Sequence, residues 1–88
     1  MTPAEALDEI RDAARLGQLR YTKHAQERMH ERNAKRADVE RACLTATGAV
    51  WQRDDVWKVT GGVDLDGDSL GIIAAIDPGD VWVITVTG

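Results

Sequence analysis

Three acidic turn sequences divide the second half of the chain into short segments. They are Asp54-Asp55, 64–68 (DLDGD) and 77–80 (DPGD), and they contain the Asp, Gly and Pro residues that favour tight turns. The segments between them are rich in Val, Ile and Trp, which predicts strands at 49–53, 56–63, 70–76 and 81–87. Because the connections are short, we expect neighbouring strands to pair antiparallel as a meander.

Alternation of side chains predicts which way these strands face. In the last strand, Trp82, Ile84 and Val86 alternate with Val83, Thr85 and Thr87. The segment 70–76 is apolar on both faces, as is typical of a central strand. We expect Trp57 and Trp82 to be largely buried against the helices.

The first half has the sequence pattern of helices. Thr2, Pro3 and Glu5 form a capping-box sequence that begins the first helix, and Gly17 ends it. The expected helices cover 3–16, 23 to 31 or 32, and about 36–47, with a short extended piece at 19–22 and Gly48 after the third helix. The order predicts a single α+β domain over 1–88, with a helical part at 1–48 and an antiparallel sheet at 49–88. The N-terminal helices are expected to pack on one face of this sheet.

Composition and charge narrow the class of protein. The single cysteine, Cys43, cannot form an internal disulfide, and the N-terminal sequence is acidic within ten residues, unlike a signal peptide. The longest apolar runs are too short to span a bilayer, so we expect a cytoplasmic protein with no membrane segment. The net charge is −4, made of +1 in residues 1–48 and −5 in residues 49–88, which argues against indiscriminate nucleic-acid binding.

The second predicted helix contains the stretch YTKHAQERMHER, which is basic in an otherwise acidic chain. At about 100° per residue, Arg28 lies about 40° and Arg32 about 80° around the helix from His24. These three side chains form a polar row beside the apolar stripe of Ala25 and Met29. The row is the one coherent constellation in the helix, and it could face phosphate.

An ordinary solvated helix would also explain this composition. Opposite charges stand at helical spacing in three pairs: Lys23–Glu27, Arg28–Glu31 and Glu31–Lys35. Judged by spacing alone, a charged helix face of this kind and a histidine beside an apolar stripe are both more often structural than catalytic.

The sequence predicts neither a metal site nor a cofactor. His24 and His30 lie about 240° apart around one helix and cannot share an ion as an i, i+4 pair does. Asp64, Asp66 and Asp68 are similar to the start of a calcium loop, but the later acidic ligand is missing. A turn between strands explains this segment better.

The stretch YTKHAQERMHERNAKRADVERAC resembles the N-terminal signature of the domain-of-unknown-function family 4258. The matching positions are Thr22, His24, Ala25, Arg28, Met29, Arg32, Asp38 and Val39, with Val83–Val86 (VITV) as the final strand. The resemblance covers about residues 19–87. Two positions depart from the family pattern: Ala34 replaces a β-branched residue, and Lys35 stands where a Ser or Thr helix cap is expected. The aromatic residue expected soon after the last strand is also absent.

This resemblance implies a RelE-like or MqsR-like toxin with a RelE/barnase-like ribonuclease fold and RNA as its substrate. A cognate antitoxin protein is the expected partner, and RNA is the expected ligand, either free or on the ribosome. The expected reaction is metal-independent endoribonuclease cleavage, in which a 2′-hydroxyl attacks the neighbouring phosphorus. His24 is the predicted proton-transfer residue, because imidazole exchanges protons near neutral pH. Arg28 and Arg32 are the predicted charge stabilisers, because guanidinium binds phosphate bidentately.

Three further residues are weaker candidates for substrate contact: Tyr21, Lys23 and Thr85. A non-catalytic module of the same fold that binds RNA or a protein remains the alternative. An antitoxin or transcription regulator is disfavoured, because the sequence has no helix-turn-helix or ribbon signature for DNA.

Overall fold

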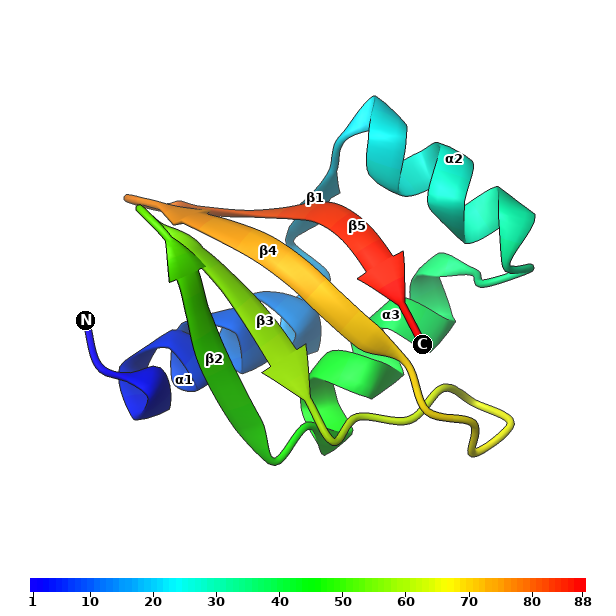
Figure 1. Cartoon of the computed structure of the whole chain (residues 1–88), viewed down its shortest axis with the longest axis horizontal. Helices are drawn as coiled ribbons and strands as arrows, with labels where there is room; N and C mark the ends of the chain where they lie inside the picture. The colour runs from blue at the N-terminus through cyan, green and yellow to red at the C-terminus, as the bar shows by residue number, and fades with distance from the viewer.

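The computed structural model describes residues 1–88 as three helices and one five-stranded sheet (Figure 1). In chain order the elements are α1 (Pro3–Arg15), β1 (Leu19–Tyr21), α2 (Lys23–Glu31), α3 (Arg36–Thr45), β2 (Gly48–Arg53), β3 (Val56–Thr60), β4 (Gly71–Asp77) and β5 (Asp80–Thr87). The α+β class and the element order confirm the prediction. No helix is long and apolar enough to cross a membrane.

The sheet has the order β1-β5-β4-β3-β2 and is mixed, not purely antiparallel. The meander from β2 to β5 is antiparallel, as predicted, but β1 pairs in parallel with β5 through Leu19–Val81, Arg20–Trp82 and Tyr21–Val83. The expectation of an antiparallel sheet confined to 49–88 is therefore wrong. The short extended piece before α2 joins the sheet as an edge strand, because its backbone groups find partners on β5.

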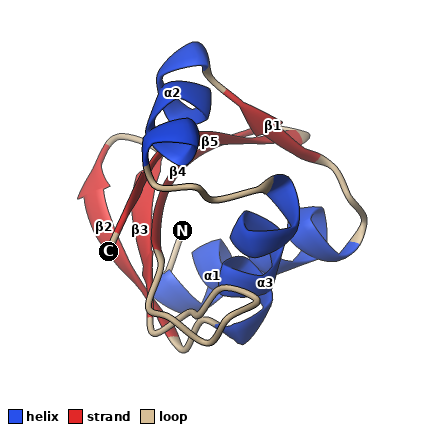
Figure 2. Ribbon diagram, turned by 90° about the vertical axis from the view of Figure 1, so that its right-hand side faces the viewer, coloured by secondary structure: helices blue, strands red, loops and turns tan.

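Helices α1 and α3 cover one face of the sheet and leave the other face open (Figure 2). The core between them is apolar throughout, and its fully buried side chains include Ile10, Val39, Val59 and Ile72. Trp57 is 5% exposed on the covered face, which confirms its predicted burial. All the residues of this core are apolar, so it holds the two layers together through apolar burial.

A β-bulge reverses the alternation of side chains in β5. The pairing with β4 shifts between Ile73 and Ala74, which oppose Thr85 and Val83, so that Ile84 is the extra residue. Val86 is fully buried with Val83, whereas Thr85 lies on the open face beside Ile73. The predicted strict alternation along this strand is wrong beyond the bulge, since sequence periodicity cannot show an inserted residue.

Trp82 also lies on the open face, and its predicted burial against the helices is wrong. It pairs with Ala75 and Arg20, and it is only half-buried. The Arg20 guanidinium lies 5.7 Å from the centre of its ring, an arrangement in which a cation and an aromatic face attract each other.

The ends of three elements differ from the prediction in ways that local contacts explain. Helix α3 ends at Thr45, two residues earlier than expected, because Gly48 already pairs with Thr60 in the sheet. Strand β3 ends at Thr60 because Gly61 turns the chain with φ +78°, and a Cβ at this position would clash with Thr47. The capping box of α1 is present: Glu5 N donates to Thr2 Oγ1 and Thr2 N donates to Glu5 Oε1.

Candidate functional site

Helix α2 is fixed at the edge of the sheet by Thr22. The backbone N–H of Thr22 donates to Val83 O at 3.1 Å, and the Thr22 hydroxyl donates to Ile84 O at 3.2 Å. The same hydroxyl accepts from Ala25 N at 3.0 Å and so caps the helix. The first turn of α2 is thereby held against the bulged part of β5, where β1 has already ended (Figure 1).

The predicted row of polar side chains lies beside the buried stripe of α2. Ala25 and Met29 are buried against the core, as predicted. His24 and Arg32 are exposed and Arg28 is half-buried. The structure therefore brings these three side chains to one side of α2, with His24 in the first turn and Arg32 at the C-terminal end.

Arg28 and Glu31 form the one salt bridge of α2. Arg28 Nη1 lies 3.4 Å from Glu31 Oε2, and both side chains are exposed enough for water to screen the pair. The other two helical pairs that the sequence suggests, Lys23–Glu27 and Glu31–Lys35, are not formed. A pair of this kind contributes about 0.2–1 kcal/mol, so a phosphate group could compete with Glu31 for the guanidinium.

Arg32 lies between the end of β5 and an acidic loop. A Cβ at Gly88 would collide with its guanidinium, so this group lies directly over the backbone that follows β5. Arg32 also lines a cavity of about 220 Å³ together with four acidic residues: Asp38, Asp64, Asp66 and Asp68. No carboxylate forms a salt bridge with it. The acidic side of this cavity repels phosphate, which leaves the sheet side of Arg32 as the direction of approach.

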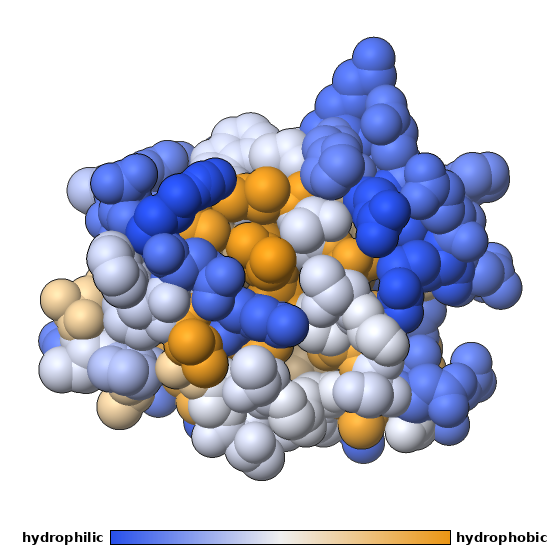
Figure 3. All heavy atoms as spheres, viewed as in Figure 1, coloured by the Kyte–Doolittle hydropathy of each residue, from blue (hydrophilic) through white to orange (hydrophobic).

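The open face of the sheet adjoins α2 and is apolar at its centre. Figure 3 shows hydrophobic side chains over the middle of the sheet and hydrophilic side chains over α2 beside them. By strand register, the open face holds these side chains: Val50, Val56, Lys58, Ile73, Ala75, Trp82 and Thr85. Thr85 thus lies on the face that α2 borders, in one cross-strand row with Ile73 and Lys58.

Lys58 is a basic residue of this face that the sequence did not single out. Its Cε lies 3.6 Å from the position a Cβ would take at Gly71, so its stem extends across β4 towards Thr87. It lines a groove of about 450 Å³ with Thr60, Ser69 and Thr87, and it has no salt bridge. Only strand register reveals its position, because nothing in the sequence links residue 58 to the end of β5.

Tyr21 points to the other side of the sheet, away from the row on α2. It pairs with Val83 on the covered face, and Arg36 of α3 lies 5.1 Å from the centre of its ring. Burial and the neighbouring Glu40 raise the pKa of its hydroxyl to about 12. The hydroxyl is buried without a hydrogen-bond partner. Tyr21 is therefore a packing residue between β1 and α3 in this structure.

Lys23 and His30 lie on the far side of α2 from the row. With Gln26, Glu27 and Glu31 they line a shallow hollow on the outer surface of the helix. His30 is exposed there, as predicted. Of the six candidate residues, Thr85 lies on the open face by strand register, and His24, Arg28 and Arg32 follow one another along one side of α2.

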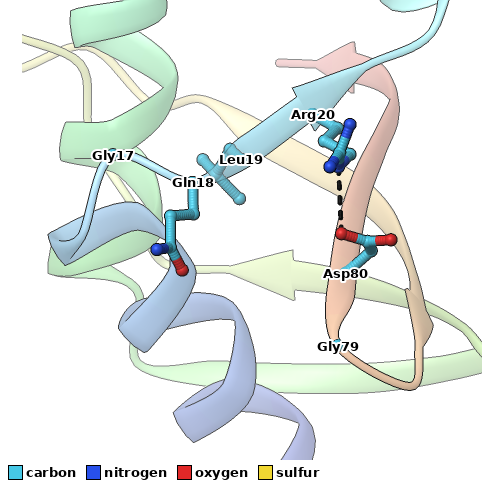
Figure 4. Close-up of a pocket in the computed structure, with 6 residues that line it drawn as sticks. All are labelled: Gly17, Gln18, Leu19, Arg20, Gly79 and Asp80. Atoms are coloured by element: carbon cyan, nitrogen blue, oxygen red, sulfur yellow. Dashed lines mark hydrogen bonds and ion pairs between the residues drawn. The ribbon is translucent and has the colours of Figure 1, made fainter.

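A second cleft lies at the opposite end of β5, where Arg20 meets the β4–β5 turn. Arg20 Nε donates to Asp80 Oδ1 at 2.9 Å across a cavity of about 440 Å³, and both side chains point into it (Figure 4). The remaining lining residues are Gly17, Gln18, Leu19 and Gly79. The two charged side chains of this cleft are paired with each other. The cleft contains no imidazole, thiol or free carboxylate for proton transfer.

The acidic loop is the part of the chain that could hold a cation. Carboxylate oxygens of Asp64, Asp66 and Asp68 lie within 4.8 Å of one another. Asp64 Oδ1 already accepts from the backbone N–H groups of Asp66 and Asp68, each at 2.9 Å. Asp38 anchors the loop to α3 by accepting from Leu65 N at 3.1 Å. The backbone N–H of Lys35, and then that of Leu65, lower the pKa of this carboxyl. These bonds account for the turn that the sequence predicts.

A sequence family accounts for most of the chain. The family described as Domain of unknown function (DUF4258) matches residues 21–87, which extend from the end of β1 to the end of β5. The chain belongs to the DUF4258 family. The match includes all of α2 with its row and leaves α1 outside, so the DUF4258 region comprises the open sheet face and the helix that borders it. No curated protein and no solved structure matches the chain.

Proposed function

We propose that this DUF4258 protein is a small metal-independent RNA endonuclease, a toxin of the RelE-like and MqsR-like superfamily that acts in the cytoplasm. The observation that supports it is the exposed His24 in the first turn of α2, with Arg28 and Arg32 following on the same side of the helix. The open sheet face beside α2 carries the polar side chains of Thr85 and Lys58. A cognate antitoxin would be its protein partner.

The chemistry requires one proton transfer on each side of the phosphorus. His24 would take the proton of the attacking 2′-hydroxyl as the new O–P bond forms. The bond from phosphorus to the 5′-oxygen then breaks, and this oxygen takes a proton from water. The products are a 2′,3′-cyclic phosphate and a free 5′-hydroxyl. Arg28 and Arg32 would bind the phosphoryl oxygens, on which negative charge increases in the transition state.

One observation favours a second function, an RNA-binding module without catalysis. His30 lies on the far side of α2, so His24 is the one imidazole on the side of the row. Arg28 is also partly neutralised by Glu31. Binding would then use the arginines and Lys58 as phosphate contacts, with no chemical step.

Cleavage of a defined RNA by two histidine variants separates these functions. We expect His24→Ala to lower the single-turnover cleavage rate by about 100- to 10,000-fold, the range that a general acid or base contributes. His30→Ala is the matched control on the same helix, and its rate should equal that of the wild type. An RNA with a 2′-deoxy nucleotide at the cut site should bind and stay intact. If the wild type binds RNA but cleaves none, with or without ribosomes, the binding module is correct.

A further inference from the structure

Strand β2 has an outer backbone edge with no partner. The sheet order places it at one end, opposite β1 (Figure 1). Sheet edges are usually protected by charged residues, proline or bulges. In β2 (GAVWQR) these devices are confined to its end, where Arg53 is the one charged residue and the pairing with β3 shifts between Trp51 and Arg53, so that 48–51 is left without them. Val50 is 52% exposed and Trp51 is 58% exposed. The opposite edge is different, because α2 packs beside β5 where β1 has ended.

A cavity beside this edge combines aromatic rings with carboxylates. It has a volume of about 350 Å³ and lies between the β2–β3 hairpin and the start of α1. We name it the Trp51 pocket; its lining includes Pro3, Trp51, Asp54, Asp55, Trp57 and Ile76. Trp51 is directly paired with Trp57 across the two strands. Its indole N–H donates to Asp54 O at 2.9 Å, which fixes the ring at the mouth of the pocket.

The charges of the pocket select the kind of side chain that fits it. Neither Asp54 nor Asp55 forms a salt bridge, and both are exposed. An ammonium or guanidinium group on an apolar stem suits such a pocket, because the stem packs on the rings and the cation meets aromatic faces and carboxylates. Met1 also lines the pocket, but the two aspartates outnumber its α-ammonium, so a basic side chain fits better than an acidic one.

We propose that β2 binds an extended basic segment of a partner protein, which adds to the sheet as a sixth strand and places a Lys or Arg side chain in the Trp51 pocket. Backbone hydrogen bonds along the free edge supply affinity in this mode, and the pocket supplies specificity. A second copy of the chain fits poorly, because two β2 strands would pair antiparallel and the segment 44–52 (LTATGAVWQ), which would then lie beside the pocket, contains no Lys or Arg. The surface is at the opposite end of the sheet from α2, so its function is independent of RNA cleavage.

Binding of two matched peptides to the ¹⁵N-labelled protein tests this surface. The probe is the capped heptapeptide Thr-Val-Thr-Lys-Thr-Val-Thr, and its partner has Glu in place of Lys. We expect the Lys peptide to bind at least tenfold more tightly than the Glu peptide. It should shift the indole signal of Trp51 and the amide signals of 49–52, and leave the indole signal of Trp82 on the open face unchanged.

Variants of the Trp51 pocket show whether its aromatic ring and its carboxylates are responsible for binding the Lys peptide. Trp51→Ala should weaken the Lys peptide by about 2- to 30-fold, the range that corresponds to a cation–aromatic contact. The double variant Asp54→Asn, Asp55→Asn should abolish the preference for Lys over Glu. Leu65→Ala, at another exposed apolar residue, should change neither affinity, and melting temperatures should confirm that each variant is folded.

Three results would overturn the proposal. The first is equal affinity for the two peptides, which would show that Asp54 and Asp55 do not select the bound side chain. The second is no binding of either peptide at millimolar concentration. The third is self-association through β2, detected by sedimentation together with a concentration-dependent shift of the Trp51 indole signal, which would make a second copy the occupant.

Discussion

Replacing Trp57 with alanine tests whether the covered face of the sheet is the core that stabilises this small domain. Trp57 is 5% exposed, so almost its whole side chain is removed from water on folding. A tryptophan buries about 150–250 Å². At about 25 cal/mol per Å² this burial corresponds to about 4–6 kcal/mol. Truncation to alanine is therefore expected to lower the free energy of unfolding by about 3–5 kcal/mol.

Trp51 provides a matched control, because it is the same residue type at the directly opposed position of β2. It is 58% exposed, so its replacement removes less than half as much buried area. The same area coefficient gives about 2–3 kcal/mol for Trp51→Ala, and an extended-chain reference makes this an upper value. Since a chain of this size is stable by about 4–13 kcal/mol, only the Trp57 variant should approach unfolding at room temperature.

Urea denaturation followed by far-UV circular dichroism measures both free energies without relying on tryptophan fluorescence. Trp57→Phe retains most of the apolar volume and should remain folded, which keeps the comparison measurable if Trp57→Ala does not fold. Equal losses at Trp51 and Trp57 would refute the inference that burial of Trp57 stabilises the core, and so would a Trp57→Ala variant with a near-native melting temperature.

Three other predictions concern RNA cleavage by the proposed site on α2 and the buried thiol of Cys43. Arg28→Lys keeps the positive charge but removes the planar guanidinium. We expect the single-turnover rate of RNA cleavage to fall by about 10- to 1,000-fold, while RNA affinity changes by less than about tenfold. An equal loss of cleavage rate and affinity would favour the binding module. A chelator such as EDTA should leave cleavage unchanged, and a strict requirement for a divalent ion would contradict the proposed chemistry. Burial raises the pKa of the Cys43 thiol from 9.0 to about 12, so the folded state retains a proton that the unfolded state loses, and stability should fall as the pH rises from about 9 to 12. Cys43→Ala should make urea midpoints less sensitive to pH in this range; an unchanged slope would show that the thiol is not responsible.

Local sequence determined the elements of this chain and their capping. The Thr2–Glu5 capping box and the apolar stripe of Ala25 and Met29 both appear where the pattern predicts them. These features depend on contacts within about one helical turn, so the sequence contains all the information that they require. The burial of Trp57 followed in the same way from alternation along a regular strand.

Candidate site residues were predictable only where they share one helix. His24, Arg28 and Arg32 form a row because helical geometry fixes their relative directions once α2 is known. The placement of Lys58 near Thr87, and of Arg32 beside the acidic loop, depends on segments that are distant in the chain. Tyr21 is adjacent to the row in sequence, yet it faces α3, because a strand and a helix orient neighbouring side chains differently.

Only the tertiary structure determined the order of the strands in the sheet and which of its faces stays open. The parallel pairing of β1 with β5 joins residues about 60 positions apart, and no local pattern specifies it. The bulge opposite Ile73 and Ala74 moves Thr85 to the open face and Val86 into the core. Trp82 shares that open face because α1 and α3 cover only the other side. Register, bulges and layer coverage are set by which packing buries the most apolar surface with every backbone group paired, and that choice depends on the whole chain at once.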